Sequence, residues 1–335
     1  MYKVISRTGV IIDGGADFSK IGAEFIEFPI TTEDEIIQCA QDADAVVVGA
    51  TEPYTRRVID TLKKCRVISR LGIGCDNIDL DAATENGIPV AYVPDASFEE
   101  VSDHTMALLM SLSRKIIPIR QAVKQGAWQP GKKELLTIRS TIARLNEQTL
   151  GLVGAGRIGG AVCKKARAFG MRVIAFDPYA SADMIKRLGA ELVSFDEILA
   201  ESDYISLHAP LTNETKHLFG LEQIKRMKST AYIINTSRGG LIDEEALLDA
   251  LSKGYIAGAG LDVTDPEPPK PDNPLLQMEN VIATGHTAFY SQSSIRELRQ
   301  RTIEAVADAL MGRQPQTLAN PQVIERSNYR IKQAA

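Results

Sequence analysis

The chain has 335 residues, of which 44% are hydrophobic and 24% charged, and its formal net charge is −5. This length exceeds the size at which one hydrophobic core usually stops growing, so two domains are expected. The composition is that of a soluble globular protein, and an acidic balance without a long basic run argues against nucleic-acid or anionic-membrane partners. We therefore expect a small-molecule partner.

The amino-terminal sequence MYKVISRTGV lacks the apolar core of a signal peptide. No window approaches the roughly 18 uninterrupted apolar residues that a membrane span needs, so a cytoplasmic location is expected. The four cysteines show no C-x-x-C spacing. Reduced thiols are therefore favoured over disulfides or a zinc site, and no metal is implied.

Short apolar runs alternate with helical-length segments from end to end, which is typical of parallel α/β sheets. The first series predicts strands at residues 3–7, 45–49, 66–71 and 89–93, with helices at 32–42, 55–63 and 80–86. The second series predicts strands at 150–154, 172–177, 204–208, 231–235, 258–262 and 281–284. Because the series restarts, two separate sheets are predicted.

A long helix is predicted between the two series. In VPDASFEE, Ser97 and Glu100 have the spacing of a capping box, and the apolar pattern that follows continues to about residue 124. A helix of this length is able to bridge two domains. Residues 125–148 have no clean period, whereas residues 295–310 repeat apolar positions at helical spacing and predict a final amphipathic helix.

The segment TLGLVGAGRIGG contains the pattern G-x-G-x-x-G at Gly154, Gly156 and Gly159. Alone the pattern is also compatible with an ordinary turn. Here it follows an apolar strand and opens an amphipathic segment at 157–169, and such a segment begins with free amides and a positive dipole end. The three glycines then allow the tight turn, the approach of a pyrophosphate and close helix–strand packing. This context predicts a dinucleotide site.

Asp177 indicates which dinucleotide is bound. It ends the next predicted strand, 18 residues after Gly159. A carboxylate at this place accepts hydrogen bonds from both ribose hydroxyls and repels a 2′-phosphate. No Arg or Lys occurs in residues 178–183 to bind that phosphate. The predicted cofactor is therefore NAD rather than NADP.

Three chemically active side chains follow apolar strands of the second series: Arg238 in NTSRGGLID, Glu267 in LDVTDPEPP and His286 in TGHTAF. Each alone is also explained as a solvated loop charge, a turn residue or a capped core histidine. Because ligands gather at the carboxyl ends of strands in open α/β sheets, the three residues can converge on one crevice. Together, beside a nicotinamide, they form the minimum set for redox chemistry on a 2-keto acid.

These motifs resemble those of the D-isomer-specific 2-hydroxyacid dehydrogenase family. RLGIGCDNIDL, VPDASFEEVSDHT, GLVGAGRIGGAV, NTSRGGLIDEEAL, LDVTDPEPP and TGHTAFYS occur in the family's order and cover most of the chain beyond residue 65. The ending, TGHTAFYSQSSIRELR followed by GRQPQTLANP, is most similar to the branch of C-terminal-binding proteins and their bacterial relatives.

The resemblance implies an α/β fold of two doubly wound parallel-sheet domains. A Rossmann NAD-binding domain at 103–286 is expected to be inserted into a flavodoxin-like substrate-binding (catalytic) domain made of residues 1–102 and 287–335. The family also implies a homodimer, formed through the helix at 97–124 and its surroundings.

The resemblance further implies a role for each site residue. Arg238 matches the arginine that holds the substrate carboxylate and polarises its carbonyl, for which the paired donors of a guanidinium are suited. His286 matches the acid–base residue, and Glu267 matches the carboxylate that favours its imidazolium form. The implied cofactor contacts are Thr105, Gly154, Gly156, Arg157, Ile158, Gly159, Asp177, Ala209, Pro210, Thr236 and Asp262, and the implied substrate contacts are Gly72, Ile73, Gly74 and Phe289.

The expected function is that of an NAD-dependent oxidoreductase interconverting a small 2-keto acid and a D-2-hydroxy acid, with His286 as acid and base. Two alternatives stay open: an NAD(H)-sensing scaffold like the C-terminal-binding proteins, and phosphoglycerate dehydrogenase activity. One departure from the family pattern concerns the histidine directly. Gly285 replaces the usual proline before His286, so the local backbone is expected to be less stiff and the histidine less securely placed.

Overall fold

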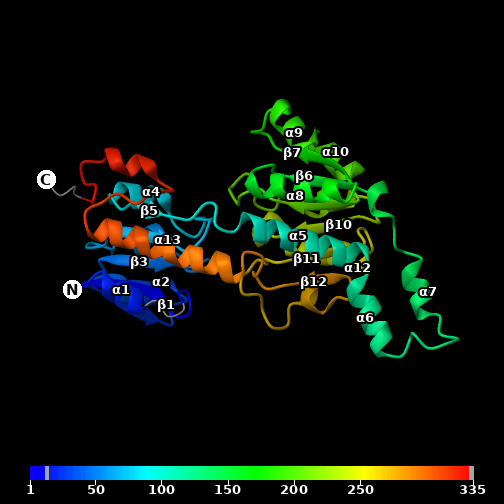
Figure 1. Ribbon diagram of the computed structural model, residues 1–335, viewed down its shortest axis with the longest axis horizontal. Helices are drawn as coiled ribbons and strands as arrows, with labels where there is room; N and C mark the ends of the chain where they lie inside the picture. Colours follow the sequence, from blue (N-terminus) through cyan, green and yellow to red (C-terminus); the bar gives the residue numbers. More distant parts are fainter. Residues whose placement is uncertain (12–14, 332–335) are drawn as a thin grey trace. The chain divides into compact units, whose positions relative to one another are not determined.

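The computed structural model describes residues 1–11 and 15–331, and the chain divides into two compact units (Figure 1). Unit 1 comprises Met1–Ser97 and Ser291–Ala335, and unit 2 comprises Phe98–Tyr290. Unit 2 is therefore an insertion in the sequence of unit 1. Across the described ranges, none of the helices combines the length and apolar character needed to cross a membrane.

Unit 1 is built on a five-stranded sheet in the order β2-β1-β3-β4-β5, with every neighbouring pair parallel. The strands are β1 (Tyr2–Arg7), β2 (Ala23–Phe28), β3 (Ala45–Val48), β4 (Val67–Arg70) and β5 (Val90–Ala91). Every residue of β3 and β4 is buried, as expected for central strands covered on both faces. Sequence analysis predicted four of these strands and missed β2.

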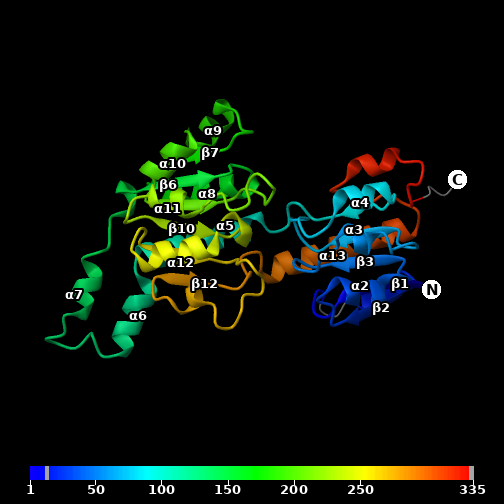
Figure 2. The same ribbon diagram turned by 180° about the vertical axis from the view of Figure 1, so that it is seen from behind.

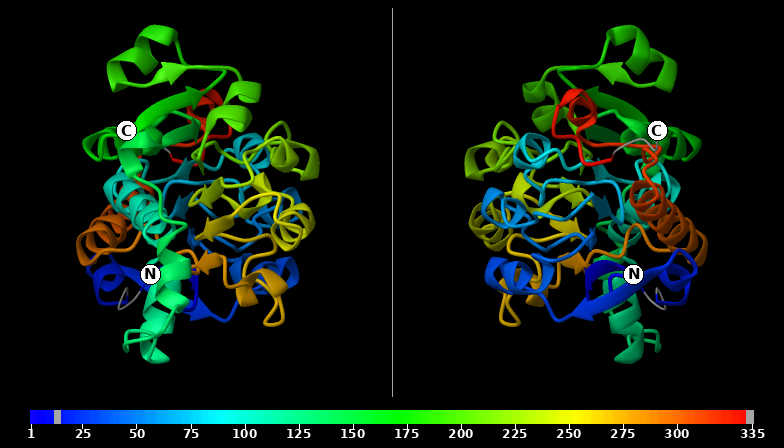
Figure 3. Two further views of the ribbon diagram at one scale, coloured as in Figure 1. Left: turned by 90° about the vertical axis from the view of Figure 1, so that its right-hand side faces the viewer. Right: turned by 90° about the vertical axis from the view of Figure 1, so that its left-hand side faces the viewer.

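Helices cover both faces of the unit 1 sheet. One face packs against α2 (Glu33–Ala40), α3 (Arg56–Ile59) and α4 (Leu80–Glu85), whose apolar side chains join one core cluster. The other packs against α1 (Gly15–Lys20) and α13 (Gln292–Leu310), which is drawn in orange in Figure 3. The 3-10 helix η4 (Pro321–Glu325) follows near the end of the chain. Ser291 caps α13 with a capping box, which fixes where this predicted helix begins.

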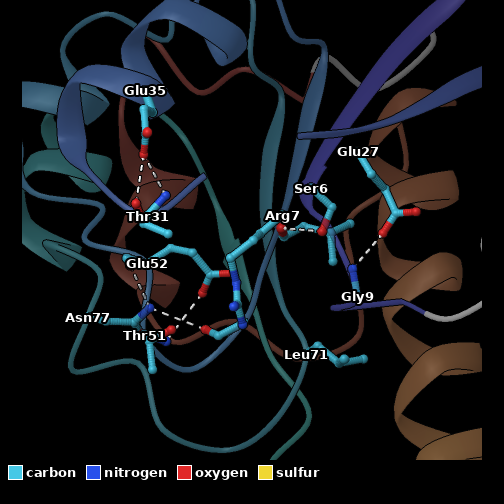
Figure 4. A network of polar contacts seen from close by, with 12 residues as sticks. Ser6, Arg7, Gly9, Glu27, Thr31, Glu35, Thr51, Glu52, Leu71 and Asn77 are labelled. Atoms are coloured by element: carbon cyan, nitrogen blue, oxygen red, sulfur yellow. Dashed lines mark hydrogen bonds and ion pairs between the residues drawn. The ribbon is translucent and has the colours of Figure 1, made fainter. Parts of the chain in front are cut away.

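A buried carboxylate stands at the carboxyl ends of β1 and β3 (Figure 4). Glu52 accepts a hydrogen bond from Arg7 Nε at 2.6 Å and another from the backbone N–H of Thr51. The side chain of Asn77 donates to the carbonyl oxygens of Gly49 and Glu52. Arg7 is 37% exposed, so it supplies the buried Glu52 carboxylate with a charged partner from the protein surface.

Unit 2 is built on a seven-stranded parallel sheet in the order β12-β11-β10-β9-β6-β7-β8. The strands are β6 (Thr149–Val153), β7 (Arg172–Phe176), β8 (Glu191–Leu192), β9 (Tyr204–Leu207), β10 (Tyr232–Asn235), β11 (Gly258–Leu261) and β12 (Val281–Ala283). All six strands predicted in this region are present. The fold class, with two doubly wound parallel sheets, is confirmed.

Helices also cover both faces of the unit 2 sheet. On one face lie α5 (Phe98–Ser113), α8 (Arg157–Ala168) and α9 (Ala182–Leu188). On the other lie α10 (Phe195–Glu201), α11 (Leu221–Lys225) and α12 (Glu244–Ser252), the last drawn in yellow in Figure 2. The 3-10 helices of this unit are η1 (Leu145–Glu147), η2 (Gly239–Leu241) and η3 (Pro274–Gln277).

The single helix predicted at 97–124 is wrong, because the chain forms two helices there. After α5, Lys115 adopts a left-handed conformation with φ of 55°, and α6 (Ile116–Lys124) starts in a new direction. Figures 1 and 2 show α6 and the following α7 (Glu134–Arg139) extending away from the sheet of unit 2. No residue of α6 is buried.

Candidate active site

The glycine-rich turn joins β6 to α8. A Cβ atom added at Gly159 would lie 2.3 Å from the carbonyl oxygen of Gly154, so only glycine permits this close helix–strand contact. Gly154 has φ of 91°, and a Cβ there would lie 2.8 Å from the backbone of His208. A Cβ at Gly156, the N-cap of α8, would meet nothing within 4 Å. The first amides of α8 therefore border open space that suits an anionic group.

Asp177 lies directly after β7 and is hydrogen-bonded to the glycine-rich turn. Its Oδ2 accepts a hydrogen bond of 2.9 Å from the backbone N–H of Ala155, and its Oδ1 accepts one of 2.9 Å from the N–H of Tyr179. Both bonds use backbone donors, so the carboxylate is held in one position beside the turn. An oxygen of this kind has two lone pairs and is still able to accept from a ribose hydroxyl.

The other predicted cofactor residues belong to the same unit. The hydroxyls of Thr105, on α5, and Thr236, after β10, lie 2.8 Å apart and are buried. The backbone of Ala209 approaches Gly154, and Pro210 follows it at the surface. Arg157 and Ile158 occupy the first turn of α8. The residues present fit an NAD dinucleotide, because the open first amides of α8 suit an anionic diphosphate and the Asp177 carboxylate suits a ribose hydroxyl.

His208, next to this turn, titrates outside the ordinary histidine range. Burial lowers its pKa to about 4, and its Nε2 lies 2.9 Å from the Ser206 hydroxyl.

Because the pKa of His208 is lowered in the folded state, the unfolded chain binds more protons than the folded chain between about pH 6.5 and 4. We expect the unfolding free energy to fall with acidification across that window, by at most about 1.4 kcal/mol per pH unit for this group. Urea titrations of wild type and His208→Gln at pH 6.5, 5.5 and 4.5 measure this, and equal pH slopes would contradict it.

The three side chains singled out for chemistry follow three neighbouring strands. Arg238 follows β10, Glu267 lies on the loop after β11, and His286 follows β12, and these strands are adjacent in the order β12-β11-β10. Since the strands are parallel, all three segments leave the same edge of the sheet. The strand endings alone predicted that these three segments share one end of the sheet.

The structure brings His286 and Glu267 into direct contact. His286 Nδ1 lies 2.5 Å from Glu267 Oε1, and each side chain is about a quarter exposed, at 23% and 25%. His286 is left-handed, with φ of 57°, which is uncommon outside glycine. Gly285 before it has φ of 66°, a value that the ring of proline forbids. This backbone path therefore suits glycine and excludes proline.

Hydrogen bonds to Asp262 restrain the loop that carries His286, although Gly285 was expected to leave that loop less stiff. Its buried carboxylate accepts hydrogen bonds from the Thr284 hydroxyl at 2.6 Å and from the N–H groups of Thr287 and Ala288 at 2.9 Å. The N–H of His286 also donates to the Asp262 carbonyl oxygen. The loop is thus fixed on both sides of the histidine.

His104 also belongs to this network, although no sequence pattern selected it as a site residue. Its Nε2 lies 2.9 Å from the Thr284 hydroxyl and 3.6 Å from the Asp262 carboxylate. His104 lies on α5 and Thr284 follows β12, so 180 residues separate the two partners. Only the fold brings them together, and no local pattern predicts the contact.

Arg238 is held through its backbone at the end of β10. The Asn235 side chain donates to the Arg238 carbonyl oxygen at 2.8 Å, and Arg238 Nη1 donates to the Ser237 carbonyl oxygen at 2.8 Å. Phe289 lies beside the histidine, with the two ring centroids 5.9 Å apart and the rings perpendicular. Perpendicular rings at this separation attract each other.

The substrate loop predicted at Gly72, Ile73 and Gly74 belongs to unit 1. Arg70 organises it, because its Nε donates to the Gly74 carbonyl oxygen at 2.7 Å and its Nη1 donates to that of Leu71. Gly72 has φ of 138°, and a Cβ there would lie 2.8 Å from Arg70 Nη1. Within residues 1–11 and 15–331, no group of three or more His, Cys, Asp or Glu side chains is arranged to hold a metal ion.

Comparison with protein families identifies the inserted unit. The family model described as "D-isomer specific 2-hydroxyacid dehydrogenase, NAD binding domain" matches residues 106–288. A glyoxylate reductase from Korarchaeum cryptofilum is 41% identical over 294 residues, which cover 87% of this chain and 86% of that protein. A D-3-phosphoglycerate dehydrogenase from Methanocaldococcus jannaschii is 42% identical over 290 residues, but the chain spans only 54% of its length.

Solved structures of the same organisation cover nearly the whole chain. The TT0316 protein from Thermus thermophilus matches with a TM-score of 0.84 and 34% identity, over 95% of this chain and 99% of that one. A D-lactate dehydrogenase from Aquifex aeolicus, complexed with NAD and lactic acid, matches with a TM-score of 0.80 and 29% identity, over 96% and 97%.

Proposed function

The chain belongs to the D-isomer specific 2-hydroxyacid dehydrogenase family, and from this premise we propose that it interconverts a small 2-keto acid and a D-2-hydroxy acid with NAD as cofactor. The contact of 2.5 Å between His286 Nδ1 and Glu267 Oε1 carries the proposal. A carboxylate in contact with Nδ1 orients the ring, and it leaves Nε2 to face a substrate.

In the direction of reduction, His286 donates its Nε2 proton to the carbonyl oxygen of the keto acid. In the reverse direction it accepts the hydroxyl proton, while Glu267 holds Nδ1–H in both. Arg238 binds the substrate carboxylate with its planar pair of donors and polarises the carbonyl. When bound, NADH supplies the hydride that reduces the carbonyl carbon. We assign Phe289 to the substrate side chain.

The proposed activity is tested by NADH oxidation against 2-keto acids graded in size and charge. The panel contains glyoxylate, pyruvate, hydroxypyruvate, apolar branched acids and 3-phosphohydroxypyruvate, the last because phosphoglycerate dehydrogenases are among the relatives. We expect turnover of at least one member, and a D configuration in every product that has a stereocentre at C2, which glycolate, the product of glyoxylate, lacks. An L product, or no turnover of any member by the folded protein with NADH bound, would contradict the proposal.

We further propose that Asp177 selects NAD over NADP. Its carboxylate is fixed by backbone donors, so it cannot turn away from a 2′-phosphate. Replacing Asp177 with Ser removes the repulsive charge, and we expect kcat/KM with NADPH to rise relative to NADH by about 10-fold or more. Asp183→Ser, an acidic residue further along the same segment, is the control. An unchanged cofactor ratio in Asp177→Ser would contradict the assignment.

We also propose that the protein is a homodimer joined through α6, α7 and the segment between them. Large apolar side chains are exposed there, with Trp128 at 75%, Leu136 at 61% and Ile116 at 51%. A second copy is the partner with matching apolar surface. We expect the double variant Trp128→Asp/Leu136→Asp to be monomeric by light scattering, while Phe169→Asp, exposed elsewhere in unit 2, stays dimeric. A monomeric wild type would contradict the assignment.

A further inference from the structure

The loop that carries Glu267 cannot hold itself in place. It runs from the end of β11 to η3, and Pro266, Pro268, Pro269 and Pro271 leave it with few N–H donors. Among the described residues, no backbone–backbone hydrogen bond involves positions 263–267. Within this stretch the Thr264 hydroxyl donates to the Pro266 carbonyl oxygen. A residue outside the loop is therefore needed to hold the Glu267 side chain in its position beside His286.

Glu244 anchors the loop through its side-chain carboxylate. Its Oε1 accepts a hydrogen bond of 2.9 Å from the backbone N–H of Asp265, two residues before Glu267. Its Oε2 accepts one of 3.1 Å from the side chain of Asn273, at the far end of the same loop. One carboxylate thus ties both ends of the loop to a single place. Hydrogen bonds to an ionised acceptor are roughly twice as strong as neutral ones.

Glu244 lies at the end of the segment that joins β10 to α12, and this segment also carries Arg238. Glu244 is the first residue of α12, and Asp243 caps that helix by accepting from the N–H of Ala246. The same segment touches the loop directly, because a Cβ at Gly239 would lie 2.0 Å from the Thr264 carbonyl oxygen. Glu244 therefore links the backbone beside the arginine to the backbone beside the glutamate.

We propose that Glu244 is a positioning residue for the reaction, acting through Glu267 to keep the carboxylate against His286 Nδ1. The inference rests on the proposed function, because it assigns Glu244 a task only if Glu267 and His286 move the proton. Without Glu244, the proline-rich loop has no anchor at Asp265, and Glu267 spends part of its time away from the histidine.

The test uses Glu244→Ala and Glu244→Gln with Glu245→Ala as the matched control. Glu245 lies in the same first turn of α12 and is exposed, so its removal changes the helix-end charge equally without touching the loop. We expect kcat to fall about 10- to 100-fold in Glu244→Ala, with KM and NADH affinity changed little, since a small misplacement is sufficient for such a loss. Glu244→Gln keeps one acceptor and should recover part of kcat.

A double-mutant cycle separates positioning from simple destabilisation. If Glu244 acts through Glu267, adding Glu244→Ala to Glu267→Gln should cost little more than Glu267→Gln alone. Multiplicative losses, or a Glu244→Ala enzyme as active as Glu245→Ala, would overturn the inference while leaving the proposed function intact. Full activity of both Glu267→Gln and His286→Gln would instead overturn the proposed function itself. Circular dichroism of each variant confirms that the compared proteins are folded.

Discussion

Replacing His286 with Gln is expected to lower kcat by roughly 10²- to 10⁴-fold, the loss typical of a removed general acid. Glutamine cannot release a proton to the carbonyl oxygen, so the chemical step is slowed in both directions. NADH binding should be unchanged, because the glycine-rich turn and Asp177 are separate from the loop of His286. Stopped-flow single turnovers with saturating NADH measure the step directly.

A second substitution at position 286 tests whether the loss of activity comes from backbone strain and not from the missing imidazole. His286 is left-handed, and Asn tolerates that conformation better than Gln, so His286→Asn should fold with the least strain and show the same loss. His217→Asn, at another left-handed histidine, is the control and should keep full activity. Unaltered single-turnover rates in both His286 variants would remove the histidine from the mechanism.

Replacing Arg238 with Lys is expected to lower kcat/KM by roughly 10²- to 10³-fold, although the positive charge is kept. Lysine presents a point charge, whereas the proposed role needs a planar pair of donors shared between the substrate carboxylate and the carbonyl oxygen. Because both the bound substrate and the transition state use these donors, KM should rise and kcat should fall. Steady-state kinetics with the best keto acid of the panel separate the two effects.

The control for this charge-preserving change is Arg226→Lys. Arg226 pairs with Asp196 at 2.7 Å on the surface of unit 2, and the loss of an exposed pair costs little. Its kinetics should match those of wild type. An Arg238→Lys enzyme with wild-type kcat/KM would show that the guanidinium geometry is not used.

Sequence reasoning predicted what depends on short-range patterns. Apolar runs predicted ten of the strands, and G-x-G-x-x-G followed by Asp177 predicted the NAD-binding unit, which the family match confirms. The family itself was predicted correctly from motif order. Two edge strands, β2 with six residues and β8 with two, were not predicted because edge strands are partly exposed and lack a continuous apolar run.

Other features depend on contacts between distant segments. The break at the left-handed Lys115 is different, because Pro118, three residues later, marks it locally although apolar residues continue on its far side. The stiffness of the His286 loop comes from Asp262, more than twenty positions earlier in the chain. Glu244 resembles an ordinary helix-start acid until the loop folds against it. Spacing identifies such residues as candidates, and only three-dimensional contacts give them partners.

The proposed reaction is tested most directly by the fate of a label. NADH carrying deuterium at the transferable position of the nicotinamide is mixed with the best keto acid of the panel other than glyoxylate, whose product glycolate has no D and L forms. The product is analysed by mass spectrometry and on a chiral column. We predict one deuterium on C2 of a D-2-hydroxy acid, formed by wild type and lost together with turnover in His286→Gln. Deuterium absent from C2, or present there in an L product, would contradict the assignment of His286, Glu267 and Arg238.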